Sequence, residues 1–264
     1  MYLVKFTDKK FIGYAVSGES VKIGSILHYR SIEDERFRDI DEGNGCIKLV
    51  MDKIDAKSFN DIMYMDGIEL NPEWSIEANG CPIFSNKSSF NPLVFSCSLV
   101  QEKNEIKKLQ DKFQTNGTYY IKNPRNFMFS IAQSIKDYMI EKYGNMKDSP
   151  YEDEDFDKLE VKPIMGQVFY TDNNNDIEVN KDNISDFNPK TFDIKGLFTK
   201  PSSFKTEKEF RFMWILEFGD RYSSFVDETL LVSVLASSLS NKTVRMSKSK
   251  LITNDGKPIQ LSFE

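Results

Sequence analysis

Two carboxylates, Glu207 and Glu209, stand two residues apart directly ahead of an apolar run. If this stretch is a β-strand, residues two apart point to the same face, so Arg211 joins both carboxylates there. Paired carboxylates at the mouth of a strand whose far end is buried suit catalytic chemistry. The plainer interpretation is a charged outer face on which glutamate and arginine offset each other, because runs of charge are usually solvated.

Further polar positions lie earlier in the chain, and each has a structural explanation as well. His28 and Arg30 belong to the run 25–30, which we predict to be a strand that turns both side chains to one face. A lone histidine is more often structural than catalytic, and an arginine ahead of an acidic stretch could be an ion-pair partner. Ser96 and Ser98 lie in an apolar strand, where their hydroxyls need partners that the backbone could equally supply.

The order of these groups resembles the arginine, serine and glutamate motifs of ADP-ribosyltransferases, here Arg30, Ser96-x-Ser98 and Glu207-x-Glu209. The resemblance implies that the arginine and the serines hold the nicotinamide half of NAD. One branch of that family uses a histidine on its first strand, a role that His28 could take. Tyr119, Tyr120 and Phe95 are available to stack on nicotinamide or adenine.

The same resemblance implies how the carboxylates act. Glu209 would be the catalytic carboxylate that contacts the ribose and stabilises an oxocarbenium-like transition state as nicotinamide leaves. Glu207 would position the acceptor, whose chemical class, protein or nucleic acid, the sequence does not reveal. We therefore predict that His28, Arg30, Ser96 and Glu209 converge on one concave surface with Glu207 near its rim.

A second resemblance covers more of the chain. The segments that carry it are Leu27-His28-Tyr29-Arg30-Ser31, Val94-Phe95-Ser96-Cys97-Ser98, Gly166-Gln167-Val168-Phe169-Tyr170, and Lys200 ahead of Glu207-Lys208-Glu209-Phe210-Arg211. Together they are similar to a widespread bacterial family of unknown function that we associate with accessory genes, including antiviral defence. This resemblance implies a toxin or defence effector with a partner protein in the same system.

Composition limits the class of protein and the kinds of site. The chain has 264 residues, 39% of them hydrophobic and 13% aromatic, which predicts a folded protein with a sizeable core. Its 35 basic and 41 acidic side chains are mixed along the chain, and the net charge is −6, so bulk charge does not support nucleic-acid binding. Three cysteines without a CxxC pattern and one histidine disfavour a zinc site.

The sequence contains neither a recognisable targeting signal nor a common nucleotide-binding motif. The N-terminus lacks the basic segment and long apolar stretch of a signal peptide, and no apolar run approaches the roughly 18 residues that span a bilayer. We therefore expect a soluble cytoplasmic protein, in a reducing compartment, with no membrane partner. Neither a Rossmann glycine motif nor a P-loop is present, so NAD would have to bind in another way.

The elements that must position these residues predict an α+β fold. The clearest is a helix over 124–143, with Asn123 as N-cap, Pro124 at the first position, apolar residues at three- and four-residue spacing, and Gly144 as the stop. A weaker helix spans 102–113. The rest is strand-rich, so we predict a mixed or antiparallel sheet with a few packed helices and long surface loops. The resemblance to ADP-ribosyltransferases implies that this sheet is split.

Strands are predicted at 2–7, 11–16, 25–30, 93–100, 161–170, 193–199, 207–218 and 229–236. The first two would form a hairpin across residues 8–10. A second hairpin would join 74–76 to 81–84 around Asn79-Gly80, a strong turn dipeptide. Polar stretches near 145–158 and 171–190 are predicted to be loop insertions in a single domain covering 1–264.

Two other functions remain open from the sequence alone. The same fold could be a non-catalytic sensor or binding module that recognises a nucleotide or a protein, with the acidic segment 33–42 as an interaction surface. A nuclease is the third option, because that segment could hold Mg²⁺, although consecutive acids on a loop are usually only solvated. A Cys97–His28 nucleophile pair is also conceivable but has no local signature.

Overall fold

The computed structural model describes residues 1–31, 44–50, 53–63, 71–77, 83–88, 91–172, 177–180, 182–183, 194–219, 221–246 and 259–260. The chain divides into two compact units, each built from separate segments. The first comprises Met1–Arg38, Asn91–Val168 and Phe204–Glu264, and the second Asp39–Phe90 and Phe169–Ser203. Both mix helices with strands, and the first contains a largely antiparallel sheet, so the predicted α+β class is confirmed. That 1–264 forms a single domain stays a prediction.

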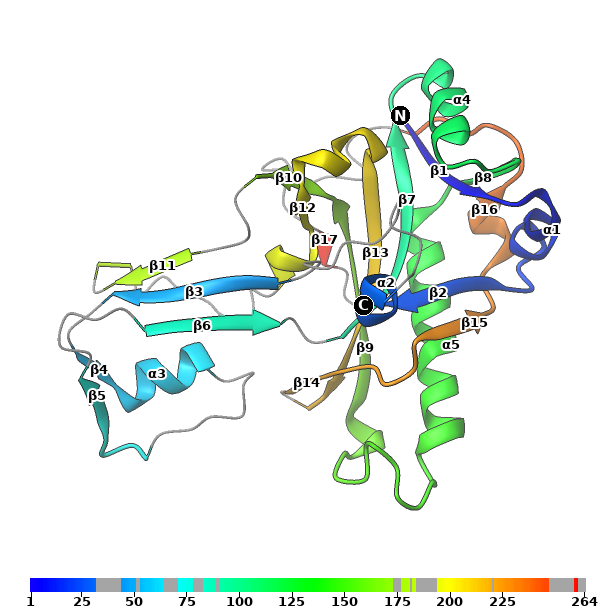
Figure 1. Cartoon of the computed structure of the whole chain (residues 1–264). Coiled ribbons are helices and arrows are strands. Elements are labelled where there is room, and N and C mark those ends of the chain that lie inside the picture. The colour runs from blue at the N-terminus through cyan, green and yellow to red at the C-terminus, as the bar shows by residue number, and fades with distance from the viewer. Residues whose placement is uncertain are drawn as a thin grey trace. The chain divides into compact units, whose positions relative to one another are not determined.

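The first unit is built on a sheet of ten strands among the described residues (Figure 1). Its main path runs in the order β16-β8-β1-β7-β13-β9-β17, with β14 beside β13 and β15 beside β2. The strands are β1 (Tyr2–Thr7), β2 (Val21–Ser25), β7 (Leu93–Val100), β8 (Gly117–Ile121), β9 (Leu159–Gln167), β13 (Glu209–Phe218), β14 (Arg221–Ser223), β15 (Thr229–Val232), β16 (Leu239–Ser240) and β17 (Ile259–Gln260). All pairs are antiparallel.

One edge of β7 is shared by two strands. β13 pairs with β7 along one edge, whereas β1 pairs on the other edge with 98–100 and β2 with 93–94. Among the described residues, no strand pairs with 95–97 on that second edge. The sheet is therefore split between β1 and β2, and we call this place, residues 95–97 of β7 with the diverging end of β1, the split.

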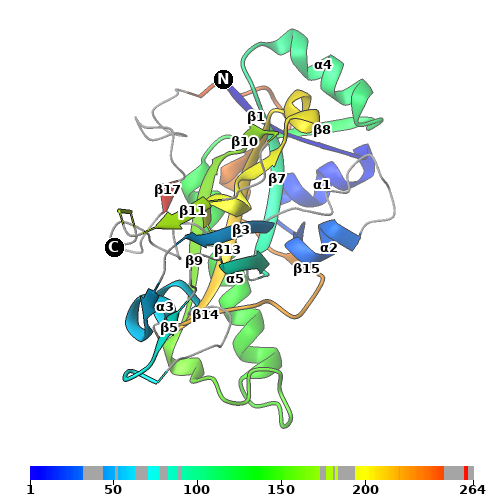
Figure 2. The same cartoon turned by 60° about the vertical axis from the view of Figure 1, so that its left-hand side comes forward.

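The helices of the first unit lie on both sides of its sheet. They are α1 (Lys9–Ser17), α2 (Ile26–Ser31), α4 (Lys103–Lys112) and α5 (Pro124–Tyr143), with the 3-10 helices η1 (Phe156–Lys158) and η4 (Ala236–Ser238). Figures 1 and 2 show α5 running alongside the sheet and α4 at the end where the N-terminus lies. The 3-10 helix η3 (Ser202–Glu207) leads into β13.

Alternation along the strands gives the sheet two apolar faces. On one face Leu3, Leu99 and Ile121 join the main core under α5, and on the other Val4 and Val100 join a smaller core under α4. Because residues two apart share a face, the α4 side of β7 continues from Val100 to Ser98 and Ser96. The serines therefore lie on the side opposite to α5.

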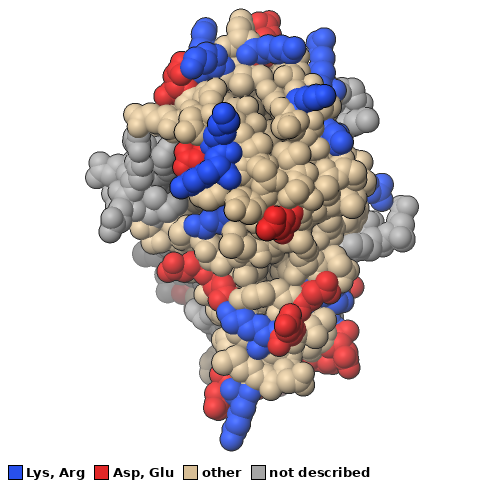
Figure 3. All heavy atoms as spheres, turned by 90° about the vertical axis from the view of Figure 1, so that its right-hand side faces the viewer, with Lys and Arg blue, Asp and Glu red and all other residues tan. Residues whose placement is uncertain are grey.

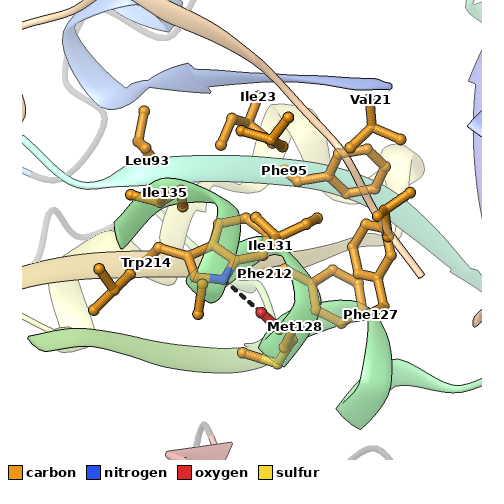
Figure 4. Packing of buried hydrophobic residues seen from close by; sticks show 14 of the residues in the cluster. Val21, Ile23, Leu93, Phe95, Phe127, Met128, Ile131, Ile135, Phe212 and Trp214 are labelled. Carbon is orange, nitrogen blue, oxygen red and sulfur yellow. Dashed lines mark hydrogen bonds between the residues drawn. The ribbon is translucent and has the colours of Figure 1, made fainter. Parts of the chain in front are cut away.

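Helix α5 confirms the prediction for 124–143 at both ends. Asn123 caps it, its side chain accepting a hydrogen bond from the Asn126 N–H at 3.2 Å, and the helix ends before Gly144. Figure 4 shows its apolar face against β7 and β13, with the Trp214 indole N–H donating to the Met128 carbonyl at 3.0 Å. Phe127 packs edge-on against Phe95 and Phe212, with ring centroids 5.1 Å apart in both pairs.

Replacing Ile135 by Ala should lower the free energy of unfolding by roughly 2–5 kcal/mol, because this side chain of α5 is fully buried in the main core. Ile140→Ala is the matched control, since Ile140 lies on the same helix and is 41% exposed. It should cost less than about 1 kcal/mol. Denaturant unfolding of both variants measures these changes. Equal losses of unfolding free energy would show that the buried face of α5 is assigned wrongly.

Several predicted strands are helices instead. Residues 11–16 lie in α1, which starts at Lys9 inside the predicted turn and ends at Ser17. Gly18 follows as its C-cap, with a φ of +84° that suits glycine. Residues 26–31 form α2, so the strand predicted at 25–30 is wrong. Residues 194–197 are helical, which corrects the strand predicted at 193–199. Short apolar runs fit either period, which explains these errors.

In the part of the second unit that the structure describes, the strands form three small sheets. They contain β3 (Asn44–Val50), β6 (Ile83–Ser88) and β11 (Ile177–Asn180); β4 (Lys53–Asp55) and β5 (Ser75–Glu77); and β10 (Phe169–Thr171) with β12 (Thr199–Pro201), while α3 spans Ala56–Met63. The predicted hairpin of 74–76 with 81–84 is wrong, because β5 pairs with β4 and β6 with β3. Asn79-Gly80 and the acidic segment 33–42 lie outside the described residues.

The surface is mixed in charge. On the face shown in Figure 3, basic and acidic side chains are both present, and uncharged surface fills much of the centre. Among the described helices, none is long and apolar enough to cross a membrane. The predicted loop at 145–158 is mostly turns and includes η1, whereas the described part of 171–190 includes β11.

Candidate functional site

A polar cluster joins the middle of β7 to the start of β13. The Ser96 hydroxyl donates to Glu209 Oε1 at 2.6 Å. The Arg211 guanidinium also holds this carboxylate, with Nε 2.8 Å from Oε1 and a terminal nitrogen 3.4 Å from Oε2. The strand register explains the contact, because Arg211 lies opposite Ser96 and Glu209 opposite Ser98. We call Ser96, Glu209 and Arg211 the serine–carboxylate cluster.

Burial makes the serine–carboxylate cluster unusual. Arg211 is 0% exposed and Glu209 5% exposed, whereas Ser96 is partly exposed. Charges removed from water interact more strongly than charges at the surface, and each costs free energy unless it is paired. The guanidinium therefore keeps Glu209 in one orientation, and Ser96 is the member of the cluster that reaches solvent.

Glu207 does not share a strand face with Glu209, which corrects the sequence prediction. It is the last residue of η3, and Lys208 between the two carboxylates has a left-handed backbone with φ +50°. The Ser98 hydroxyl donates to the Glu207 carbonyl at 2.7 Å, so Ser98 holds this turn. Glu207 itself is buried and lies 3.8 Å from the Lys112 ammonium. The turn thus separates the two carboxylates.

The left-handed turn gives a stability prediction. Lys208→Val should lower the free energy of unfolding by about 1–2 kcal/mol more than Lys208→Asn, because a β-branched residue resists this conformation and asparagine tolerates it. Both variants lose the ion pair with Glu105, so their difference isolates the backbone. Urea unfolding of the two proteins measures that difference. Identical midpoints would show that valine is not strained at position 208.

Lys5 approaches the serine–carboxylate cluster from β1. Its ammonium donates to the Ser96 carbonyl at 2.7 Å and lies 4.5 Å from the centre of the Phe95 ring. Removal from water lowers the pKa of Lys5, and the neighbouring Cys97 and Glu209 oppose that shift. No local sequence pattern marks Lys5, because only the pairing of β1 with β7 brings it close to Ser96.

The neighbouring thiol and ring groups belong to the core. Burial raises the pKa of the Cys97 thiol far above its ordinary value, and Cys97 contacts the Phe210 carbonyl at 3.5 Å. Such a thiol stays protonated, which argues against a Cys97–His28 nucleophile pair. Phe95, Tyr119 and Tyr120 are all buried, so the three rings expected to stack on a ligand are packed inside the protein.

His28 and Arg30 lie on α2, not on a strand. Residues two apart on a helix point to different sides, so their predicted common face is wrong. The His28 ring lies 3.8 Å from a Glu228 carboxylate oxygen and 5.7 Å from the Tyr29 ring. The described contacts thus place Ser96 beside Glu209, as predicted, whereas His28 lies beside the carboxylate of Glu228.

A relative of known function would show whether these residues have the roles that the sequence predicts. No family model, no curated protein and no solved structure matches the chain. The role of each residue in the serine–carboxylate cluster therefore has to be argued from its geometry. Among the described residues, no group of three or more His, Cys, Asp or Glu side chains could hold a metal ion.

Proposed function

We propose that this protein is an ADP-ribosyltransferase-like enzyme that cleaves NAD and transfers ADP-ribose to an acceptor. The hydrogen bond between Ser96 and Glu209, with Arg211 holding the same carboxylate, is the observation that carries the proposal. A fixed carboxylate in a poorly hydrated place stabilises a developing positive charge more than a mobile one in water.

In the proposed reaction, the main task of the enzyme is to stabilise positive charge on the ribose with a fixed carboxylate. The bond between the ribose C1′ and the nicotinamide nitrogen breaks, its electron pair stays with the nitrogen, and neutral nicotinamide leaves. Positive charge develops on the sugar and is stabilised by Glu209, while Ser96 and Arg211 keep the carboxylate oriented. The acceptor forms the new bond to C1′ and gives its proton to solvent or to a nearby base.

The remaining predicted residues take revised roles in the proposal. We propose Arg30 for the NAD pyrophosphate, because guanidinium groups suit paired phosphate oxygens. Ser98 acts by holding the Glu207 carbonyl and not by touching NAD. Glu207 stays the candidate for the acceptor side, and we propose a toxin or antiviral defence role on the resemblance given above.

Nicotinamide release is the direct test. Purified protein is incubated with NAD, with and without a lysate that supplies acceptors, and nicotinamide is measured by chromatography beside calorimetric titration of NAD. We expect binding and slow release, and loss of release in Glu209→Gln. A wild-type protein that neither binds nor cleaves NAD under both conditions would overturn the proposal.

A non-catalytic binding module is the second candidate, and one observation favours it. Glu209 is 5% exposed and both of its oxygens accept hydrogen bonds from Arg211, which is how a purely structural buried ion pair looks. In that case the protein binds a nucleotide or protein partner without turnover. Binding of NAD by the wild type with no release of nicotinamide would favour this candidate.

A further inference from the structure

At the split, backbone groups of β7 lie outside the hydrogen-bonded ladder of the described strands. In an antiparallel strand, the N–H and C=O of one residue point to the same edge, and neighbours alternate. The Leu99 N–H donates toward Lys208, on the β13 side, so odd-numbered residues of β7 face β13. Ser96 therefore turns both its N–H and its C=O toward the split, where none of the strands that the structure describes pairs with residues 95–97.

Lys5 occupies this gap. Its ammonium donates one of its three N–H groups to the Ser96 carbonyl at 2.7 Å. Lys5 and Ser96 are partly exposed, whereas Phe95, Cys97 and Glu209 around them are buried. Lys5 and Ser96 are therefore the residues of this gap that solvent reaches in part, whereas the carboxylate lies deeper.

We propose that the split binds an anionic phosphate oxygen through the Lys5 ammonium and the Ser96 backbone N–H. Both groups are donors, and the nearby carboxylate of Glu209 is already paired with Arg211, so the charge that faces a ligand is positive. Charge-assisted hydrogen bonds to phosphate are stronger than neutral ones. A bound anion would also offset the removal of the ammonium from water, which lowers the pKa of Lys5.

The site rests on the proposed function in one respect, since it would receive a phosphate of NAD beside Glu209. Its chemistry selects phosphate-bearing ligands over neutral nucleosides. Binding can be measured without any turnover. A failure of the anion site and a failure of the enzyme proposal therefore give different results.

Calorimetric titration tests the site with inorganic pyrophosphate, ADP and adenosine. Lys5→Gln should weaken pyrophosphate and ADP binding about ten- to a hundredfold, because one charge-assisted hydrogen bond is lost. Lys5→Arg keeps the charge and should bind nearly as well as the wild type. Lys22→Gln is the matched control, since Lys22 is an exposed lysine on β2, and it should leave binding unchanged. Equal affinities for ADP and adenosine would overturn the phosphate assignment.

A second measurement avoids any loss of fold in the variants. Wild-type protein is acetylated with and without pyrophosphate, and mass spectrometry follows Lys5 and Lys22. Pyrophosphate should protect Lys5 and leave Lys22 unchanged. Unprotected Lys5, or unchanged affinity in folded Lys5→Gln, overturns the site even if NAD is cleaved. Protection of Lys5 in a protein that does not cleave NAD supports the site and removes only the enzyme proposal.

Discussion

Arg211→Met should lower the free energy of unfolding by about 3–5 kcal/mol, one of the largest losses that a single substitution in this chain can cause. Arg211 is 0% exposed and holds both oxygens of Glu209. Methionine fills much of the same volume, so the loss comes mainly from a carboxylate left buried without its cation. Denaturant unfolding followed by circular dichroism measures it.

Two controls separate the charge from the packing. The double variant Arg211→Met/Glu209→Gln should recover part of the stability, because the uncompensated charge is gone. Arg221→Met breaks an exposed pair with Glu154, whose atoms are 3.1 Å apart, and should cost less than about 1 kcal/mol. If the double variant is as unstable as the sum of its parts, the ion pair does not account for the loss.

Glu209→Gln should slow nicotinamide release about a hundredfold to a thousandfold. The substitution also leaves the buried Arg211 without its carboxylate and so lowers stability, and the rate is therefore measured on protein that circular dichroism shows to be folded. Glutamine keeps the shape and can still contact Ser96, but it offers no negative charge to the developing cation. Affinity for NAD should change much less than the rate, because the charge matters most in the transition state. Single-turnover chromatography and calorimetry give the two quantities separately.

The matched control for this experiment lies on the same strand. Glu217 is also 5% exposed and pairs with Lys162, at the other end of β13. Glu217→Gln should leave nicotinamide release at the wild-type rate, whereas Glu207→Gln should impair transfer to an acceptor more than simple NAD hydrolysis. Full activity in both Glu207→Gln and Glu209→Gln would place the chemistry elsewhere in the chain.

Local signals in the sequence were enough where one element carries its own beginning, period and end. Helix α5 is the example, since Asn123, Pro124 and Gly144 mark it without help from the rest of the fold. The strand at 93–100 was recognised because its apolar run is long and bounded. The strand predicted at 11–16 is wrong because a run of six apolar-rich residues fits a strand or a helix equally well, and only Gly18 beyond it marks a helix end.

The candidate site could be predicted only in part, because its contacts join residues that lie far apart in the sequence. The sequence identified Ser96 and Glu209, and the two side chains do meet. It could not show that Lys208 adopts a left-handed turn, which removes Glu207 from the strand, because that depends on Ser98 and the β7 ladder. Lys5 lies 91 positions before Ser96, and no local pattern links such distant residues.

The position of β13 in the chain has a consequence for synthesis. This strand lies between β7 and β9 in the sheet, yet it spans Glu209–Phe218 and so leaves the ribosome long after both neighbours. Until then, the edges of β7 and β9 that it will cover have no partner, and unpaired apolar edges promote aggregation. Pairings over such long sequence separations also form slowly. Nascent chains that stop before residue 209 should therefore depend on chaperones, whereas those that extend well past 218 can close the sheet.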